Sequence, residues 1–133
     1  MKRLLAILIV LLLPLPAQAA TATDSARQAW DWLALVDAGK YDDSWSAASA
    51  YFQSKVTKEQ WFAMIAPVRN GVGPVTARGQ AAVTLTDSLP NAPFAHYAVV
   101  VFPSAFAIKG KCSETVIMVL QDGEWKVAGY FIQ

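Results

Sequence analysis

Cysteine and histidine are almost missing from this chain, whose 133 residues include one of each, Cys112 and His96. A lone cysteine excludes a disulfide within the chain, and the shortage of both residue types excludes the usual zinc sites. A lone histidine leaves one candidate for a Ser–His pair, and no serine stands in a nucleophile-elbow motif. We therefore expect Cys112 to be a half-buried structural residue at a strand end and His96 to lie at a rim.

Charge is also scarce, because charged residues make up 16% of the sequence and the two signs nearly cancel. A neutral surface has no general attraction for nucleic acid or for anionic lipid. The sequence contains no CxxC, HExxH, phosphate-binding loop or glycine-rich dinucleotide motif. We predict no metal, no cofactor and no nucleic-acid partner.

A long apolar run is present only at the N-terminus, from Leu4 to Leu13, after Lys2 and Arg3 and before Ala17-Gln18-Ala19. A basic start, a short apolar stretch and a small-x-small site are typical of a secretory signal peptide. The run has about half of the ~20 residues that span a bilayer. We expect cleavage after Ala19, a periplasmic or secreted protein without membrane attachment, and a single domain over residues 20–133.

The first half of the exported chain has helical patterns. Ser25 with Gln28 and Thr57 with Gln60 form two capping boxes, and Asp42 can cap a helix between them. Gly39 is placed to end the first helix. We expect helices over residues 25–38, from residue 42 through Phe52, and over residues 58–69, the last burying Trp61, Met64, Ile65 and Val68.

From Val75 onward apolar and polar residues alternate with a period of two, which predicts strands. Arg78 falls on the polar face of the first strand. Asp122-Gly123 is a strong hairpin signal between the last two strands. The strands are expected over residues 75–86, 96–106, 113–121 and 124–132. The predicted fold class is α+β, with three helices packed on a curved four-stranded antiparallel sheet.

The hairpin register follows if Gln121 faces Glu124 across the turn. Glu114 then faces Phe131, and both lie on the more apolar face, which should contact the helices. The opposite, outer face has no helix left to cover it, so we expect it to form a homodimer. The apolar residues assigned to that outer face are Ile117, Val119, Tyr130 and Ile132.

Several short motifs occur together in a characteristic order. They are Trp32-Leu33, Asp37-x-Gly39-x-Tyr41, Ser44-Trp45, Trp61, Arg69, Gly73, Arg78, Leu89-Pro90-x-x-Pro93, Tyr97, Glu114-Thr115-Val116 and Asp122-Gly123-x-Trp125-x-Val127-Ala128-Gly129-Tyr130. Over about residues 26–132 the chain resembles the bacterial family called "domain of unknown function 4019". The resemblance implies an exported protein with a cystatin-like, nuclear-transport-factor-2-like cone fold. It implies no activity.

Glu114 is the strongest candidate site residue, because a carboxylate at the end of a core-facing row lies where such a cone opens. Desolvation there favours a proton-transfer role. The alternative is a structural ion pair with Arg69 or Arg78. Asp37 can face inward at the end of the first helix, or it can be a solvated or turn-capping aspartate.

Two functions remain open from the sequence. The preferred one is a non-catalytic exported module that binds a small ligand, a peptide or a partner protein. The alternative is a small pocket enzyme of the isomerase or lyase type. In that enzyme Glu114 or Asp37 would be the base and Tyr97 or Tyr130 the hydrogen-bond donor, by analogy with ketosteroid isomerase at the level of fold alone.

Overall fold

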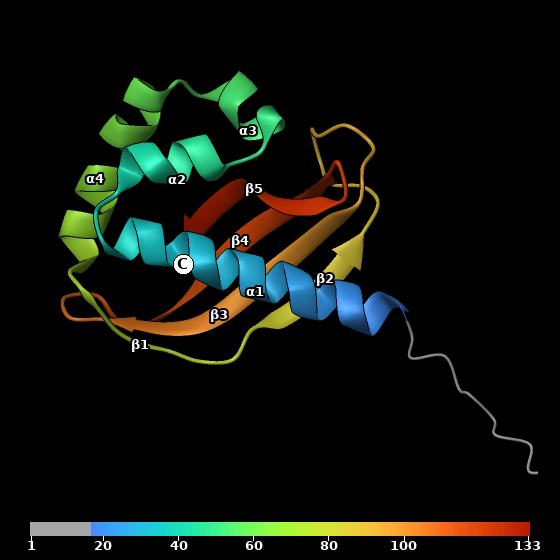
Figure 1. Ribbon diagram of the computed structural model, residues 1–133. Helices are drawn as coiled ribbons and strands as arrows, with labels where there is room; N and C mark the ends of the chain where they lie inside the picture. The colour runs from blue at the N-terminus through green and yellow to red at the C-terminus, as the bar shows by residue number, and fades with distance from the viewer. Residues whose placement is uncertain (1–16) are drawn as a thin grey trace, which may run out of the picture.

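A computed structural model describes residues 17–133 (Figure 1). In this part of the chain the helices are α1 (Ala17–Asp37), α2 (Tyr41–Ala47), α3 (Ala50–Lys55) and α4 (Lys58–Val72). The strands are β1 (Val75–Arg78), β2 (Ala82–Thr86), β3 (Tyr97–Phe106), β4 (Gly110–Gln121) and β5 (Glu124–Ile132). Residues 1–16, which hold most of the expected signal peptide, lie outside the described residues.

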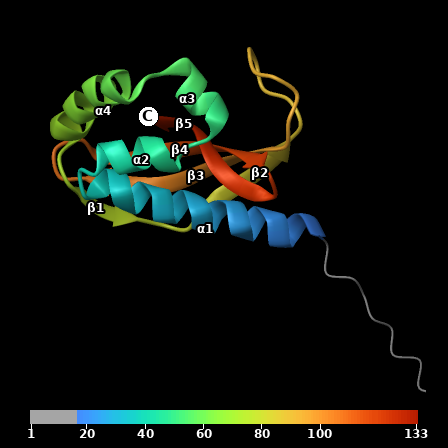
Figure 2. The ribbon, with the colours of Figure 1, turned by 45° about the horizontal axis from the view of Figure 1, so that its top comes forward.

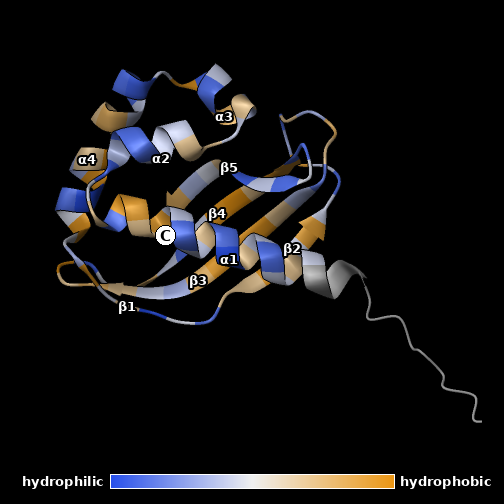
Figure 3. Cartoon of the chain, in the orientation of Figure 1, coloured by the Kyte–Doolittle hydropathy of each residue, from blue (hydrophilic) through white to orange (hydrophobic). Residues whose placement is uncertain are grey.

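The strands form an antiparallel sheet in the order β1-β3-β4-β5, and β2 pairs with another stretch of β3. Figures 1 and 2 show α1 running across one face of the sheet, with α2, α3 and α4 on the same side. In Figure 3 hydrophobic residues colour β3 and β4 where α1 crosses them. The predicted α+β class is therefore confirmed, with one helix and one strand more than expected within the described residues.

The core lies between α1 and the inner face of the sheet. Leu33 and Val36 of α1 are buried against Val100 of β3 and against Val116 and Met118 of β4. Leu33 and Val36 are three residues apart and so lie on one face of the helix. Val116 and Met118 are two residues apart and so lie on one face of the sheet. Burial of these side chains is what fixes α1 on the sheet.

The start of α1 differs from the prediction, because the helix begins at Ala17 and includes Ser25. The Ser25 hydroxyl donates to the Ala22 carbonyl at 2.8 Å inside the helix, so it caps nothing. The alanine-rich stretch before it has high helix propensity, which outweighs the capping signal. The end is as predicted, with Gly39 at a φ of +72°. No helix within residues 17–133 is long and apolar enough to cross a membrane.

The second predicted helix is two helices, because the chain is extended at Ala48 and Ser49. The Ser49 hydroxyl accepts from the Phe52 N–H and caps α3, while its own N–H donates to Val127 of β5 at 2.8 Å. Both bonds compete with continuation of the helix. Asp42 does not cap α2, so the prediction of that cap was wrong as well.

The third predicted helix, α4, has the expected capping box, with both the Thr57 and the Gln60 bonds present. It continues three residues beyond its predicted end at Arg69, to Val72, and its C-cap is Gly73 with a φ of +80°. Trp61, Ile65 and Arg69 are buried, whereas Met64 and Val68 are exposed, contrary to the prediction. The buried row is thus the one that brings Arg69 toward α1.

The first predicted strand is divided into β1 and β2 at residues 79–81. The Gly79 N–H donates to the Pro103 carbonyl at 2.7 Å, and a Cβ on Gly79 would lie 2.8 Å from the Pro103 ring. This close approach interrupts regular pairing with β3. The sheet therefore has five strands where four were predicted.

The Asp122-Gly123 turn forms as predicted, with φ of +52° and +79° at its two residues. Beside the turn the predicted pairs are present, including Leu120 with Trp125. Further along, Ala128 is an extra residue in β5, since Met118 pairs with Val127 and Ile117 pairs with Gly129. This is a β-bulge.

The bulge corrects the predicted register for the rest of the hairpin. Glu114 lies opposite Ile132 instead of Phe131, and Val116 lies opposite Tyr130. Because strand side chains alternate between faces, a shift of one residue exchanges the two faces. Tyr130 and Ile132 therefore belong to the inner face and Phe131 to the outer one.

Candidate functional site

A row of polar side chains crosses the inner face of the sheet. Arg78 of β1 pairs with Ser104 of β3, which lies diagonally across from Glu114 of β4, and Glu114 in turn lies diagonally across from Tyr130 of β5. Diagonal neighbours on one sheet face are within reach of long side chains. The registers therefore bring these four residues together, and they place Arg78 inward instead of on the predicted polar face.

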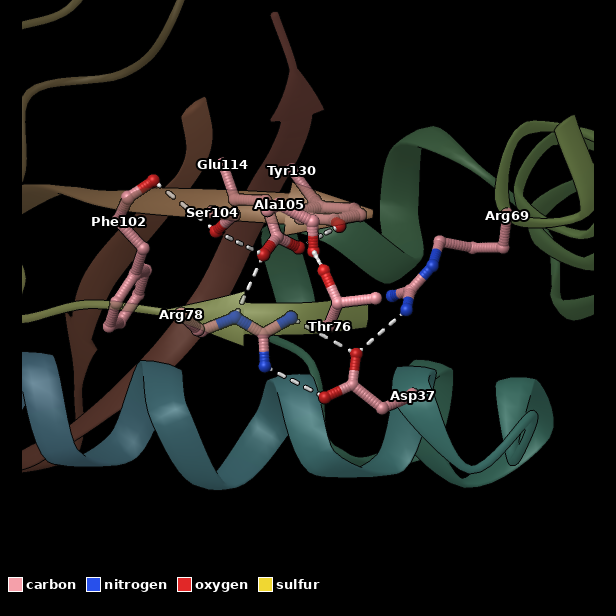
Figure 4. Close-up of polar contacts among 9 residues, drawn as sticks. All are labelled: Asp37, Arg69, Thr76, Arg78, Phe102, Ser104, Ala105, Glu114 and Tyr130. Carbon is pink, nitrogen blue, oxygen red and sulfur yellow. Dashed lines mark hydrogen bonds and ion pairs between the residues drawn. The ribbon is translucent and has the colours of Figure 1, made fainter. Parts of the chain in front are cut away.

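Glu114 lies at the centre of this row, and its exposed fraction is 0%. One carboxylate oxygen accepts hydrogen bonds from Arg78 Nε at 2.8 Å and from the Ser104 hydroxyl at 2.7 Å. The other oxygen accepts a short hydrogen bond from the Tyr130 hydroxyl. Figure 4 shows the three donors converging on it. A buried carboxylate needs such partners, because an unpaired one costs several kcal/mol.

Asp37 joins this row to the helices. It is the last residue of α1, and its carboxylate accepts from Arg69 Nη2 of α4 at 2.8 Å. It also accepts from Arg78 Nη1 at 2.7 Å and from Arg78 Nη2 at 3.0 Å. A carboxylate at a helix C-terminus opposes the helix dipole, and the two guanidinium groups offset that cost. Of the two interpretations of Asp37, the structure therefore supports the inward-facing one.

Burial and neighbouring charges shift the pKa values of three cluster residues, and that of Arg78 is raised because its hydrogen bonds to Asp37 and Glu114 outweigh the effect of burial. Burial acts to raise the pKa of Asp37, but the hydrogen bonds and charges of Arg78 and Arg69 outweigh burial and hold that pKa below its usual value. Burial, together with the adjacent Glu114, raises the pKa of the Tyr130 phenol well above its usual value. Asp37 therefore stays ionised and Tyr130 stays neutral near neutral pH.

The two arginines also lie on aromatic rings. Arg69 is centred 5.1 Å from the Phe106 ring, and Arg78 is 5.8 Å from the Trp30 ring. Among the buried side-chain polar atoms of residues 17–133, Arg69 Nη1 lacks a hydrogen-bond partner. Stacking on Phe106 compensates in part for that missing bond.

Of the predicted site residues, five meet in this charge cluster: Asp37, Arg69, Arg78, Glu114 and Tyr130. The predicted ion pair to Glu114 is present and uses Arg78, which also pairs with Asp37, while Arg69 pairs with Asp37 alone. Ser104 completes the cluster and was not predicted. The β3–β4 register places Ser104 beside Glu114, and no local turn signal in the sequence determines that register.

The other two predicted site residues lie elsewhere. His96 is exposed, as expected for a residue at the rim, and its ring pairs with Asp87 at 2.9 Å, a contact that was not predicted. Tyr97 is buried on the opposite side of the strand from the cluster and donates to the Pro93 carbonyl at 2.7 Å. Cys112 is half-buried near the start of β4, and burial raises the pKa of its thiol.

A groove of about 680 Å³ lies between α1 and the β4–β5 hairpin, which we call the α1–hairpin groove. Its lining includes Asp24, Asp31 and Trp32 from α1, and Leu120, Trp125 and Lys126 from the hairpin. A second cavity of about 450 Å³ shares Leu120 and Trp125 with it and extends toward Asp87 and His96. A third, of about 380 Å³, lies beside Trp30, Arg78 and Gly79. Glu114 lines none of the three.

These features define a small α+β protein whose inward-facing charges neutralise one another and whose α1–hairpin groove lies apart from them. The chain belongs to the family described as "Protein of unknown function (DUF4019)", whose sequence model matches residues 28–130. No curated protein and no solved structure matches the chain significantly.

Proposed function

We propose that this protein is an exported, non-catalytic binding module and that the α1–hairpin groove is its binding site. The observation that carries the proposal is the state of Glu114. This carboxylate is fully buried, accepts from three donors and lines none of the three cavities. A proton-transfer group must reach its substrate, whereas a carboxylate held in this way joins strands and helices.

The electrostatics of the cluster argue in the same direction. A general base works best when its pKa lies near the operating pH, and the pKa of Asp37 is held below its usual value. The Tyr130 hydroxyl already donates to the buried Glu114 carboxylate, so it is not free to donate to a substrate. The pairings that an isomerase or lyase would use are therefore engaged in holding the fold.

The proposal includes export. Cleavage after Ala19 would leave a mature single domain over residues 20–133 that retains most of α1, including the buried residues Ser25 and Ala29. We further propose that its sheet and helices form a cone of the cystatin-like, nuclear-transport-factor-2-like type. The helices on one face of the sheet and the groove between α1 and the hairpin support this assignment.

A second surface supports a homodimer. The helices of the described residues cover one face of the sheet, and the outer face carries Ile117 beside Phe131, which is 51% exposed. Val119 on the same face is already buried within the chain. We propose that two copies cover the apolar part of this face with each other.

Native mass spectrometry of protein isolated from the periplasm of its own bacterium tests the proposal. We expect the mass of residues 20–133, with an additional bound ligand or partner. The variant Gln28→Trp places a large side chain in the groove and should lose that bound species. Ala34→Trp, on an exposed part of α1 outside the groove, should retain it.

The mass of the uncut chain would contradict export. A bound species that survives Gln28→Trp would contradict the groove as its site.

A further inference from the structure

We propose that the α1–hairpin groove selects an organic cation, in the form of an amine attached to an apolar or aromatic body. The inference rests on the proposed function, because it names the class of ligand for that same groove. It follows from the apolar groove floor, from the charges along the groove walls and from the adjoining cavity.

The groove floor is apolar and is formed by residues from both sides. Met118 and Leu120 of β4 and Trp125 of β5 lie opposite Trp32 and Leu35 of α1. Trp125 and Met118 are buried in the core with little of their surface left to solvent. Sites for small organic ligands have such apolar floors with a few polar groups at the edge, and a volume of about 680 Å³ is in their usual range.

Among the described charged residues that line the groove, one carboxylate has no cationic partner. Arg27 pairs with Asp24 at 2.7 Å, and Lys126 pairs with Glu124 at 3.3 Å. Asp31 also lines the groove, and no hydrogen bond or ion pair joins it to another described residue. Each lining arginine or lysine is thus already beside a carboxylate, whereas Asp31 is available to a cation from outside.

The position of Asp31 relative to the floor determines the shape of the ligand. Asp31 lines the same groove as Trp32 and Trp125, so a cationic group beside its carboxylate can place an attached apolar body over the floor. The adjoining cavity shares Leu120 and Trp125 and carries a further carboxylate, Asp87, which pairs with His96. Neither cavity presents an unpaired arginine or lysine that would favour an anion.

Three probes with the same phenyl body and different charge test the proposal. They are phenethylamine, 2-phenylethanol and 3-phenylpropionate, added to isotope-labelled mature protein whose groove resonances are followed by NMR. We expect the amine to bind about three- to tenfold more tightly than the alcohol, and the propionate to bind most weakly. The preference for the amine should decrease with added salt.

Two variants separate the charge of Asp31 from general effects. Asp31→Asn should reduce the affinity for the amine to that for the alcohol, with no change for the alcohol itself. Asp42→Asn changes an exposed aspartate of α2 outside the groove and should leave the preference intact.

Equal affinities for amine and alcohol in the wild type would overturn the inference while leaving the groove as a binding site. An amine preference that survives Asp31→Asn would also overturn it. If none of the probes shifts the groove resonances, the cation inference fails, and the native mass measurement decides the proposed function independently.

Discussion

At the scale of single residues, the charge cluster connects parts of the chain that are far apart in sequence. Arg78 contacts both carboxylates and so links α1, β1 and β4, while Arg69 adds α4 to the same group. The side chain of Arg78 is 7% exposed and that of Asp37 is 23% exposed, so solvent screens these pairs weakly. Loss of one member leaves its partners charged in a desolvated site.

Glu114→Gln should destabilise the protein by about 3 kcal/mol, because Asp37 alone is then left to neutralise the two buried guanidinium groups of Arg69 and Arg78. Urea unfolding followed by circular dichroism measures the change. Glu124→Gln is the matched control, since Glu124 is exposed at the hairpin turn, and it should change stability by less than about 0.5 kcal/mol. Equal effects of the two substitutions would contradict a structural role for Glu114.

Asp37 predicts a pH dependence of stability on the acid side. Its pKa in the folded state is below its ordinary value of 3.8, so the folded state binds the proton less readily than the unfolded chain does. The resulting stabilisation is present above the unfolded pKa and is lost as the pH falls through the folded pKa. As the pH is lowered from about 6 to about 2, the free energy of unfolding should therefore decrease more steeply for the wild type than for Asp37→Asn. Parallel curves would show that Asp37 contributes nothing in this range.

At the scale of secondary-structure elements, two local irregularities arrange the site. The bulge at Ala128 turns Tyr130 toward Glu114, and the break at Gly79 divides the edge strand next to Arg78. Bulges and glycines in strands commonly redirect side chains in this way. Each irregularity makes a prediction.

The bulge predicts that the Tyr130 phenol ionises at a higher pH than an ordinary tyrosine. With an unbroken register Tyr130 would face outward, whereas on the inner face burial and Glu114 raise its pKa above the ordinary value of 10.0. An alkaline titration followed by ultraviolet absorbance should show that Tyr130→Phe removes a phenol from the late-titrating part of the curve. Removal of a phenol that ionises near pH 10 instead would contradict the inward placement.

The break at Gly79 predicts opposite effects for two glycine-to-alanine substitutions. Gly79→Ala should destabilise by about 1–3 kcal/mol, because the new Cβ would lie 2.8 Å from the rigid Pro103 ring. Gly71→Ala lies within α4, where a Cβ meets no atom within 4 Å, and it should stabilise by up to about 1 kcal/mol. Thermal unfolding of both variants is the measurement. A neutral or stabilising Gly79→Ala would show that Pro103 moves aside freely.

At the scale of the whole molecule, the helices and the groove occupy one face of the sheet, and no helix of the described residues covers the other face (Figure 2). The corrected register gives this outer face Ile117, Gly129 and Phe131, with the Phe131 ring beside Gly129. Tyr130 and Ile132, expected there from the sequence, are not part of it. The proposed dimer therefore depends on a different pair of residues.

Sedimentation at micromolar concentration should give twice the mass of the mature chain. The double variant with Ile117→Lys and Phe131→Lys should sediment as a folded monomer, because two ammonium groups cannot be buried without partners. Phe62→Lys is the control, since Phe62 is similarly exposed, at 52%, but lies on α4. A monomeric wild type would refute the dimer.

The sequence by itself determined the features that depend on neighbouring residues. The α+β class, the helical first half, the Thr57 capping box, the Gly39 helix end and the Asp122-Gly123 turn were all predicted, because each signal lies within a few residues of its effect. The pairing of Glu114 with an arginine was also predicted, since a buried carboxylate needs a cation.

Only the tertiary structure decided which groups meet. Residues 128–132 are apolar or aromatic on both faces of the strand apart from Gly129, so their pattern does not show a shift of one residue. The bulge at Ala128, and with it the contact of Tyr130 with Glu114, therefore left no local signal. The inward position of Arg78 depends on its pairing with Ser104 across the sheet, and the choice of Arg69 as partner of Asp37 depends on how α4 packs. Such contacts join residues 16 to 36 positions apart, and their geometry is set by packing of the whole fold.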